Sequence, residues 1–264
     1  MSYINENKKA WENAFDQRSG TYSDDLAKKL LEKENPFFHE DFLNVINAYD
    51  FTGKTIGQYC TNNGRELLQL SKRGVHQAVG FDLAKNMVDY ANTIAKNLKL
   101  PAQFVESDIL QIDASYNNYF DFGLITVGAI CWFEDLRLFF KKVSETLKPG
   151  ASLFIHELHP FQLMLATSSE SNYIPTHPKT PVNNYFENKV WKEHGMGYMT
   201  DKKGIENTFT SFSHTLSDIF NALIANGFEI ELFKEFDYCV GNLFNALDSK
   251  GIPLSMILVA KKHT

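Results

Sequence analysis

Short apolar segments alternate with helix-patterned segments from Thr55 to Leu158, and this alternation constrains the fold more than any other feature. The apolar segments lack the strict alternation of a half-exposed strand, which indicates burial on both sides. Because the connections are short, successive strands should run parallel, with helices covering both faces of one sheet. The predicted strands are 55–59, 77–82, 102–107, 120–128 and 151–158, and the predicted helices among them are 64–74, 84–98 and 133–150.

The end of the chain returns to the same pattern after an interruption. An amphipathic helix is predicted over 213–227, with Ser213 as its N-cap and Gly227 as its C-cap. Two final strands follow at 228–236 and 254–262. The whole therefore has the fold class α/β, built as a doubly wound sheet.

Two regions lie outside this core pattern. Residues 1–50 are polar and helical in pattern, broken near Pro36, and are predicted to form a helical lid. Residues 160–212 contain several prolines and many aromatic side chains with little periodicity, which indicates an insertion rather than a linker. We expect one domain over 1–264 in which 160–212 forms a cap after the fifth strand.

Composition narrows the classes of function. The formal net charge of −6 and the pI near 5.8 argue against a nucleic-acid binder, which usually presents a basic face. Cys60, Cys131 and Cys239 are widely spaced and fit a reducing compartment. The longest apolar run, FGLITVGAICWF, is shorter than the roughly 20 residues of a membrane helix. We expect a cytoplasmic protein without a membrane partner.

Acidic and small residues follow the predicted strands where parallel strands present their carboxyl ends. Asp82 ends the second strand, where an acid can bridge two ribose hydroxyls, although it could instead cap the next helix. Asp108, after the third strand, could accept a hydrogen bond from an adenine amino group or cap a short helix. Gly128, after the fourth strand, would let a ligand approach the backbone. These positions predict a nucleotide-type site at one edge of the sheet.

The complete series resembles class I S-adenosylmethionine-dependent methyltransferases over about residues 50–264. The motifs that carry the resemblance are TIGQYCTNNG, GFDLAKNM, VESDI, FDFGLITVGAICWF and LKPGASLFIHELHP. It implies a seven-stranded sheet whose last strand is antiparallel, and S-adenosylmethionine as cofactor. The residues to which it assigns cofactor contacts are Gln58, Cys60, Asn62, Gly64, Asp82, Leu83, Met87, Asp108, Ile109, Val127, Gly128 and Trp132.

The first motif departs from the family pattern of an acid followed by alternating glycines. Gln58 stands in the acidic position, and Cys60 and Asn62 replace the first two glycines, leaving Gly64. Asparagine tolerates the left-handed conformation better than other non-glycine residues, so Asn62 and Asn63 can keep the bend. Cys60 is small enough to lie beneath the cofactor, and no partner base marks it as a nucleophile.

Three residues are candidates for catalytic or acceptor contacts. Glu157 and His159 follow the fifth strand, close to the expected position of the methyl group, and His214 begins the helix after the insertion. Each could instead be structural, as a polar strand end, a proline turn or a helix start. His156 and Glu157 should point to opposite faces of their strand, so no metal site is predicted. The aromatic candidates for a substrate cage, or for a small core of the insertion, are Tyr173, Tyr185, Phe186, Trp191 and Tyr198.

The predicted function is methyl transfer to a small-molecule acceptor. No Asn-Pro-Pro-Tyr element of base-modifying methyltransferases follows the fourth strand, which further disfavours a nucleic-acid target. A nicotinamide oxidoreductase would require a G-x-G-x-x-G string, and none occurs. A non-catalytic cofactor-binding or regulatory protein remains the alternative, because the loop is unusual and no base is certain. The expected state is a monomer or a homodimer.

Overall fold

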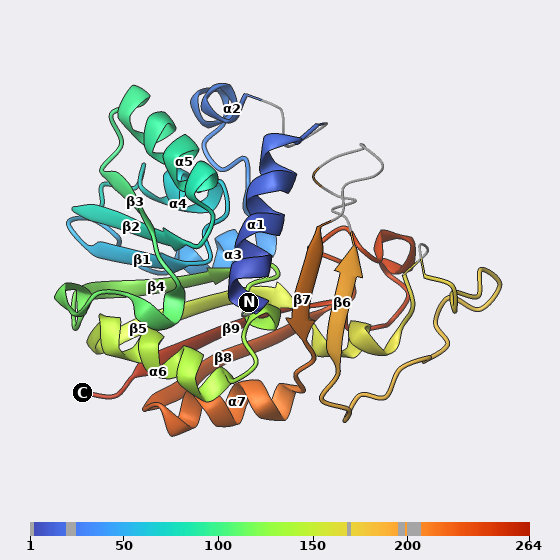
Figure 1. The fold of residues 1–264 in the computed structure, drawn as a ribbon. Coiled ribbons are helices and arrows are strands. Elements are labelled where there is room, and N and C mark those ends of the chain that lie inside the picture. Colours follow the sequence, from blue (N-terminus) through green and yellow to red (C-terminus); the bar gives the residue numbers. More distant parts are fainter. Residues whose placement is uncertain (1–2, 20–24, 168–169, 195–198, 200–206) are drawn as a thin grey trace.

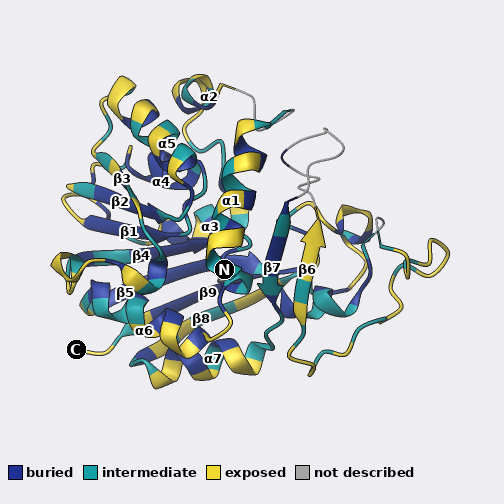
Figure 2. Ribbon diagram, viewed as in Figure 1, coloured by how far each residue is buried: buried dark blue, intermediate teal, exposed yellow. Residues whose placement is uncertain are grey.

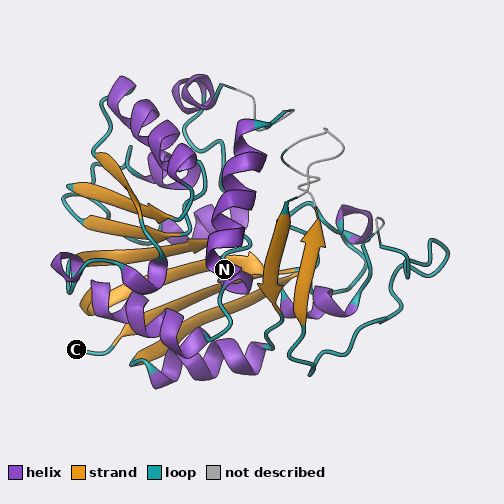
Figure 3. Cartoon of the chain, viewed as in Figure 1, coloured by secondary structure: helices purple, strands orange, loops and turns teal. Residues whose placement is uncertain are grey.

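The fold is a seven-stranded sheet with helices on both faces, as a computed structural model shows for residues 3–19, 25–167, 170–194, 199 and 207–264 (Figures 1 and 3). The strand order is β3-β2-β1-β4-β5-β9-β8, and β9 is antiparallel to both of its neighbours. The predicted doubly wound α/β fold with an antiparallel last strand is therefore confirmed. Its strands are β1 (Thr55–Tyr59), β2 (Gln77–Asp82), β3 (Ala102–Glu106), β4 (Phe120–Thr126), β5 (Leu147–Leu158), β8 (Phe228–Phe236) and β9 (Ser255–Lys262).

Two groups of helices cover the sheet, each burying an apolar stripe. Helices α2 to α5 pack on one face, and α6 and α7 pack on the other. Phe139, Phe140 and Val143 of α6 are completely buried, which is typical of a helix whose apolar residues recur on the side facing a core. The helices are α1 (Tyr3–Asp16), α2 (Leu26–Glu32), α3 (Glu40–Ile46), α4 (Arg65–Leu70), α5 (Lys85–Asn97), α6 (Leu136–Thr146) and α7 (Leu216–Ala225).

Some predicted boundaries are wrong for local reasons. Helix α7 begins after Thr215, not Ser213, because Thr215 and Asp218 form a reciprocal capping box. Asn226 is its C-cap, and Gly227 follows with φ +77°. The predicted stop at Pro149–Gly150 is also displaced, since α6 ends at Thr146 and the Pro-Gly pair lies within β5.

The segment 160–212 contains a second small sheet that the sequence did not reveal. After the 3-10 helix η5 (Pro160–Met164), strands β6 (Val190–His194) and β7 (Thr208–Phe212) form an antiparallel pair. This pair lies beside α1, and the two run next to each other in Figure 1. Asn7 of α1 donates to the carbonyl of Thr210 and accepts from its N–H, both at 2.8 Å. The side chain of Asn7 therefore bonds to β7 as a neighbouring strand would.

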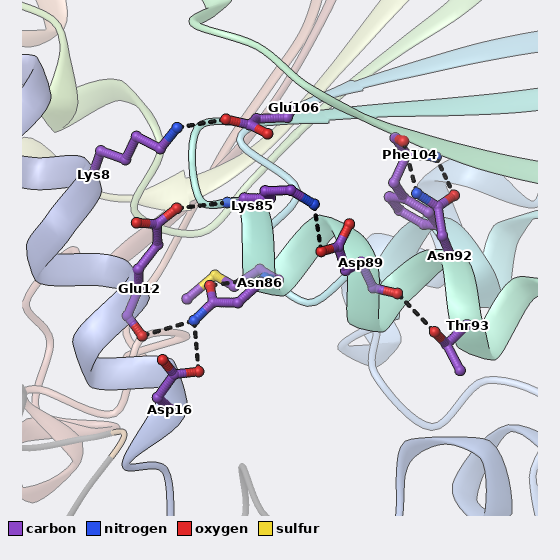
Figure 4. A network of polar contacts seen from close by, with 11 residues as sticks. Lys8, Glu12, Asp16, Lys85, Asn86, Asp89, Asn92, Thr93, Phe104 and Glu106 are labelled. Atoms are coloured by element: carbon purple, nitrogen blue, oxygen red, sulfur yellow. Dashed lines mark hydrogen bonds and ion pairs between the residues drawn. The ribbon is translucent and has the colours of Figure 1, made fainter.

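Helix α1 is also attached to the start of α5 (Figure 4). Glu12 accepts a hydrogen bond from the N–H of Lys85 at 3.1 Å. Asn86 donates to the Glu12 carbonyl and to Asp16, both at 2.8 Å, and Lys8 forms an ion pair with Glu106 at the end of β3. Contacts on both sides thus hold α1 across the carboxyl ends of the strands.

Gly64, the one glycine kept in the loop after β1, should be hard to replace. Its φ is +78°, and an added Cβ would lie 2.6 Å from Phe104 and 2.8 Å from the Cβ of Ala91. We expect Gly64→Ala to lower the free energy of unfolding by about 2–5 kcal/mol, through backbone strain and overpacking together.

Gly53 is a matched control for Gly64. Its φ is +70°, but an added Cβ would meet nothing within 4 Å. Gly53→Ala should therefore lower the free energy of unfolding through backbone strain alone, by about 1–2 kcal/mol. Urea unfolding measures the free energy of unfolding of both variants. Equal decreases in the two variants would show that steric crowding at Gly64 is unimportant.

Candidate functional site

The candidate site lies along the carboxyl edge of the sheet, where β1, β2, β3 and β4 end. The interiors of β1, β2 and β4 are mostly buried, whereas residues that end or follow the strands regain solvent exposure (Figure 2). Loops at this edge form the ligand site in open α/β sheets. The predicted cofactor residues that are half-buried there are Cys60, Asn62, Asp82, Leu83, Asp108, Val127, Gly128 and Trp132.

The turn after β1 keeps its bend without most of the usual glycines. Asn62 has φ +52°, in the left-handed region expected for it, and Cys60 has φ +60°, which its sequence position alone did not indicate. The N–H of Asn62 donates to Oδ2 of Asp82 at 2.7 Å, and the Asn62 side chain accepts from the N–H of Asn63 at 2.8 Å. Burial raises the pKa of the Cys60 thiol, so it remains protonated at neutral pH.

Asp82 connects this turn to the start of α5. One carboxylate oxygen accepts from Asn62, and the other accepts from the N–H of Ala84 at 3.0 Å. Burial raises the pKa of Asp82 to about 6, although its backbone hydrogen bonds oppose that shift. Asp82 ends β2 and is not the N-cap of α5, which is Ala84. Each of its oxygens keeps lone-pair capacity for a ligand hydroxyl.

Asp108 caps the short 3-10 helix η2 (Ile109–Gln111). Its Oδ1 accepts from the N–H of Leu110 at 3.0 Å, so the structural alternative for this residue is present. Among the other predicted contacts, Ile109 is buried in the hydrophobic cluster beneath α6 and α7, and Met87 is buried in the cluster that includes residues of α1. A role for these three residues in binding remains a prediction.

Aromatic rings cover the end of β4. Trp132, in the 3-10 helix η4 (Ile130–Trp132), packs edge-to-face on Trp11 of α1 with ring centroids 5.3 Å apart. Phe209 of β7 lies 5.3 Å from Trp11 and 6.2 Å from Trp132. The helix α1 and the insertion thus meet over this corner of the edge.

Glu157 requires a correction, because its carboxylate is already occupied. It is 3% exposed and accepts the N–H groups of Gly128 at 2.7 Å, Ala129 at 2.6 Å and Ile130 at 3.1 Å. It also accepts the N–H of Leu158 at 2.7 Å. A carboxylate with four backbone donors has little capacity for an acceptor substrate or a proton from it.

His159 requires a similar correction. Its Nδ1 accepts from the N–H of Phe161 at 3.0 Å, which caps η5. Its Nε2 lies 2.8 Å from Oε1 of Glu235, in β8, without the alignment of a hydrogen bond. Both ring nitrogens therefore face groups of the protein, and His159 has a capping role rather than that of a free base.

His214 differs from the other two candidates. Its Nε2 lies 2.8 Å from the carbonyl oxygen of Phe133, directly after η4, and must carry the proton to donate to that carbonyl. Burial lowers the pKa of His214, so the ring is neutral at pH 7. In this tautomer the lone pair is on Nδ1, the nitrogen that can accept a proton.

The described aromatic side chains of the insertion have separate surroundings and do not share one cage. Phe186 is 82% exposed, and the Tyr185 hydroxyl accepts a hydrogen bond at the start of α7. The ring of Trp191 already carries the Lys189 ammonium 3.5 Å from its centroid, so that face is not open to a sulfonium. Tyr198 lies outside the described residues.

Unpaired polar atoms near the edge test whether the cofactor fits. Oε1 of Gln58, Oγ1 of Thr61 and Oδ1 of Asn63 are buried without a hydrogen-bond partner in the described part of the chain. The amide of Gln58 donates to Thr126 at 2.8 Å, which leaves its oxygen as the acceptor. Buried acceptors usually have donors, and an ammonium group is a suitable one. Gly128 has φ +83° with open space where a Cβ would lie, so the residues fit S-adenosylmethionine.

Comparisons with known proteins agree with this geometry. Residues 59–155 match the family model described as Methyltransferase domain. An S-adenosylmethionine-dependent methyltransferase from Mesorhizobium loti superposes with a TM-score of 0.62 at 19% identity, covering 88% of this chain and 100% of that one. One from Methanosarcina mazei gives 0.60 at 20% identity, covering 83% and 97%. Geranyl diphosphate C-methyltransferase from Streptomyces coelicolor A3(2) gives 0.63 at 11% identity, covering 99% and 98%.

Residues 59–155 thus match a methyltransferase domain, and the fold around them is the one that S-adenosylmethionine-dependent methyltransferases share. The structural similarities, all below 25% identity, bear on the fold alone. A sequence search among curated proteins finds no match.

Some features of the site are not among those predicted from the sequence. Thr126, the partner of Gln58, is one of them, although its polar side chain at the end of β4, next to Val127, is a signal that the sequence contains. The contacts of Asn7 and Trp11 join segments about 200 residues apart, which periodicity cannot pair. Across 3–19, 25–167, 170–194, 199 and 207–264, no helix is long and apolar enough to cross a bilayer, and no cluster of three potential metal ligands occurs.

Proposed function

We infer that the protein transfers a methyl group from S-adenosylmethionine to a small-molecule acceptor. The observation that carries the proposal is the hydrogen bond between the N–H of Asn62 and Asp82, because it joins the altered turn and the strand-end acid into one edge. Asp82 would hold the ribose hydroxyls, and Gln58 and Asn63 would offer oxygens to the ammonium group. Gly128 would let the cofactor approach the backbone closely.

Alignment is the main task that this chemistry leaves to the protein. The cofactor supplies a methyl group activated by a positively charged sulfur. The chain must hold the acceptor atom in line with it and keep water away. Helix α1, η4 and β7, which meet through Trp11, Trp132 and Phe209, would enclose the site for this purpose.

His214 is the proposed general base for an acceptor that must lose a proton. The Phe133 carbonyl fixes its tautomer and orientation, and the depressed pKa keeps it neutral at pH 7. The other two sequence candidates, Glu157 and His159, are engaged elsewhere. A positioned base of this kind typically contributes about 10²- to 10⁴-fold to the rate.

A small acceptor is supported by charge and by the segment over the site. The chain carries a net charge of −6, which disfavours a polyanionic target. The structural neighbour that matches 99% of this chain, the insertion included, is named for geranyl diphosphate, a small molecule. The chemical class of the acceptor here is not implied by that name.

The proposal is tested by product formation. The full chain is incubated with S-adenosylmethionine and pools of small amines, hydroxyls, thiols and carbon acids, and S-adenosylhomocysteine is measured by mass spectrometry. Acceptor-dependent product supports the proposal. Tight binding of S-adenosylhomocysteine without turnover in any pool would favour the alternative, a non-catalytic cofactor-binding protein. Absence of binding would exclude both.

Cofactor affinity should depend on pH through Asp82. Its carboxylate, with a pKa of about 6, must be ionised to accept fully from ribose hydroxyls. The affinity for S-adenosylhomocysteine should therefore be constant above pH 7 and fall about tenfold between pH 7 and pH 5, as the free protein takes up a proton. Calorimetry at each pH measures this, and Asp82→Asn, which cannot titrate, should remove the dependence. An unchanged slope in Asp82→Asn would assign the titration to another group.

A further inference from the structure

The turn after β4, residues 127–132, is fastened to the neighbouring strand by one side chain. Glu157 points to the opposite face of β5 from His156, which stacks on Phe42 of α3. On its own face, Glu157 meets three successive N–H groups of the turn after β4. Its Oε2 accepts from Gly128, and its Oε1 accepts from both Ala129 and Ile130.

These bonds form a compact anion site that the chain fills with its own carboxylate. Successive N–H groups at the start of a helical turn create a concave donor surface for an anion. Bonds from N–H groups to a carboxylate are stronger than those between neutral groups. Burial raises the pKa of Glu157, and the bonds from Gly128, Leu158, Ile130 and Ala129 counteract that effect by favouring the charged form.

The same turn carries the parts of the site that face a ligand. Gly128 presents its open side with φ +83°, and Trp132 supports Trp11 of the covering helix α1. The hydrogen bonds within the turn are longer than those to Glu157: the N–H of Trp132 donates to the Ala129 carbonyl at 3.3 Å, and Sγ of Cys131 lies 3.4 Å from the Gly128 carbonyl oxygen. The shape of the turn therefore depends on Glu157 more than on its own bonds.

We propose that Glu157 is a positioning residue, whose carboxylate sets the turn 127–132 in the shape against which the cofactor lies. This proposal rests on the proposed function, since it requires that the cofactor bind at this edge. Glu157 contacts neither cofactor nor acceptor in this role. It acts through the backbone of Gly128, Ala129 and Ile130.

Glu157→Gln is the sharpest test. The amide keeps the size of the side chain but places an NH₂ donor against a backbone N–H donor, so the turn must shift. We expect the dissociation constant of S-adenosylhomocysteine, measured by calorimetry on the full chain, to rise at least about tenfold. Circular dichroism first establishes that the variant is folded.

Asp121→Asn is the matched control. Asp121 is also a partly buried carboxylate that accepts a backbone N–H, that of Thr55 at 2.9 Å, but it lies at the opposite end of β4. A merely structural loss should lower the melting temperature in both variants alike. Only Glu157→Gln should weaken ligand binding, and Asp121→Asn should stay within about twofold of the unchanged protein.

The outcomes separate this proposal from the function it rests on. If the unchanged protein does not bind S-adenosylhomocysteine, the proposed function fails. If it binds and Glu157→Gln binds equally well, or if Asp121→Asn weakens binding as much, the positioning role is overturned. Should Glu157→Gln not fold, Glu157→Asp is measured instead. The shorter aspartate side chain cannot reach the three N–H groups together. Unchanged affinity of the Glu157→Asp variant for S-adenosylhomocysteine therefore also overturns the proposal.

Discussion

Asp82→Ala should weaken the binding of S-adenosylhomocysteine by about 10- to 100-fold, equivalent to roughly 1.5–3 kcal/mol. The carboxylate has two functions that are lost together. It would accept the ribose hydroxyls, and it accepts the N–H groups of Asn62 and Ala84 at 2.7 and 3.0 Å, which shape the turn. Calorimetry on the folded variant measures the loss directly.

Asp89→Ala is the control for Asp82. Asp89 lies on α5, exposed and paired with Lys85 at 2.6 Å, so its removal takes away a nearby negative charge without touching the edge (Figure 4). The affinity of the Asp89→Ala variant for S-adenosylhomocysteine should equal that of the unchanged protein. A folded Asp82→Ala variant with full affinity would refute the ribose assignment. Equal losses of affinity in both variants would show that the effect of Asp82 is one of long-range electrostatics and not of contact with the ribose.

The core strands were predictable because burial on both faces leaves a strong local pattern. Strands β1, β2 and β8 have the predicted bounds. Helix and strand ends were less predictable where a cap competes with periodicity. Residue type favours Ser213 as the N-cap, but the reciprocal hydrogen bonds of Thr215 and Asp218 place the start of α7 after Thr215.

The insertion could not be predicted because its order comes from distant partners. Strand β6 is mostly exposed and β7 is anchored by Asn7, some 200 residues away. Neither strand shows a local pattern that distinguishes it from a loop. The same limit applies to the covering helix α1, whose polar pattern indicates a helix but not which surface it binds.

The site was predictable in position but not in the roles of its side chains. Strand ends place Asp82, Asp108 and Gly128 at one edge, as the spacing indicates. A strand pattern also gives the face on which Glu157 lies. It cannot show that three N–H groups of the turn after the neighbouring strand β4 lie within hydrogen-bond distance of Glu157. Nor can it show that the ring of His159 caps η5. Roles depend on neighbours in space, and these come from the fold.

His214→Gln should reduce kcat by about 10²-fold or more once an acceptor is identified, because it removes the proposed base. The amide of glutamine can still donate to the Phe133 carbonyl, so the local structure should persist. The affinity for S-adenosylhomocysteine should stay unchanged, which separates this effect from that of Asp82→Ala. In the unchanged protein kcat should rise with pH through a pKa below 6.5 and then level off, since the neutral ring is the active form.

His194→Gln provides the control for His214. His194 is exposed on β6, and register places it on the side of the hairpin opposite to Glu193 and Phe209, whose ring packs on Trp11. This variant should keep full turnover and the same pH profile. If His214→Gln were equally active, no base at this position would be needed, as is the case for an acceptor atom that is already deprotonated, such as that of a carboxylate or thiolate. The pH profile would then follow the acceptor instead of the protein, and comparing two acceptors of different pKa would show it.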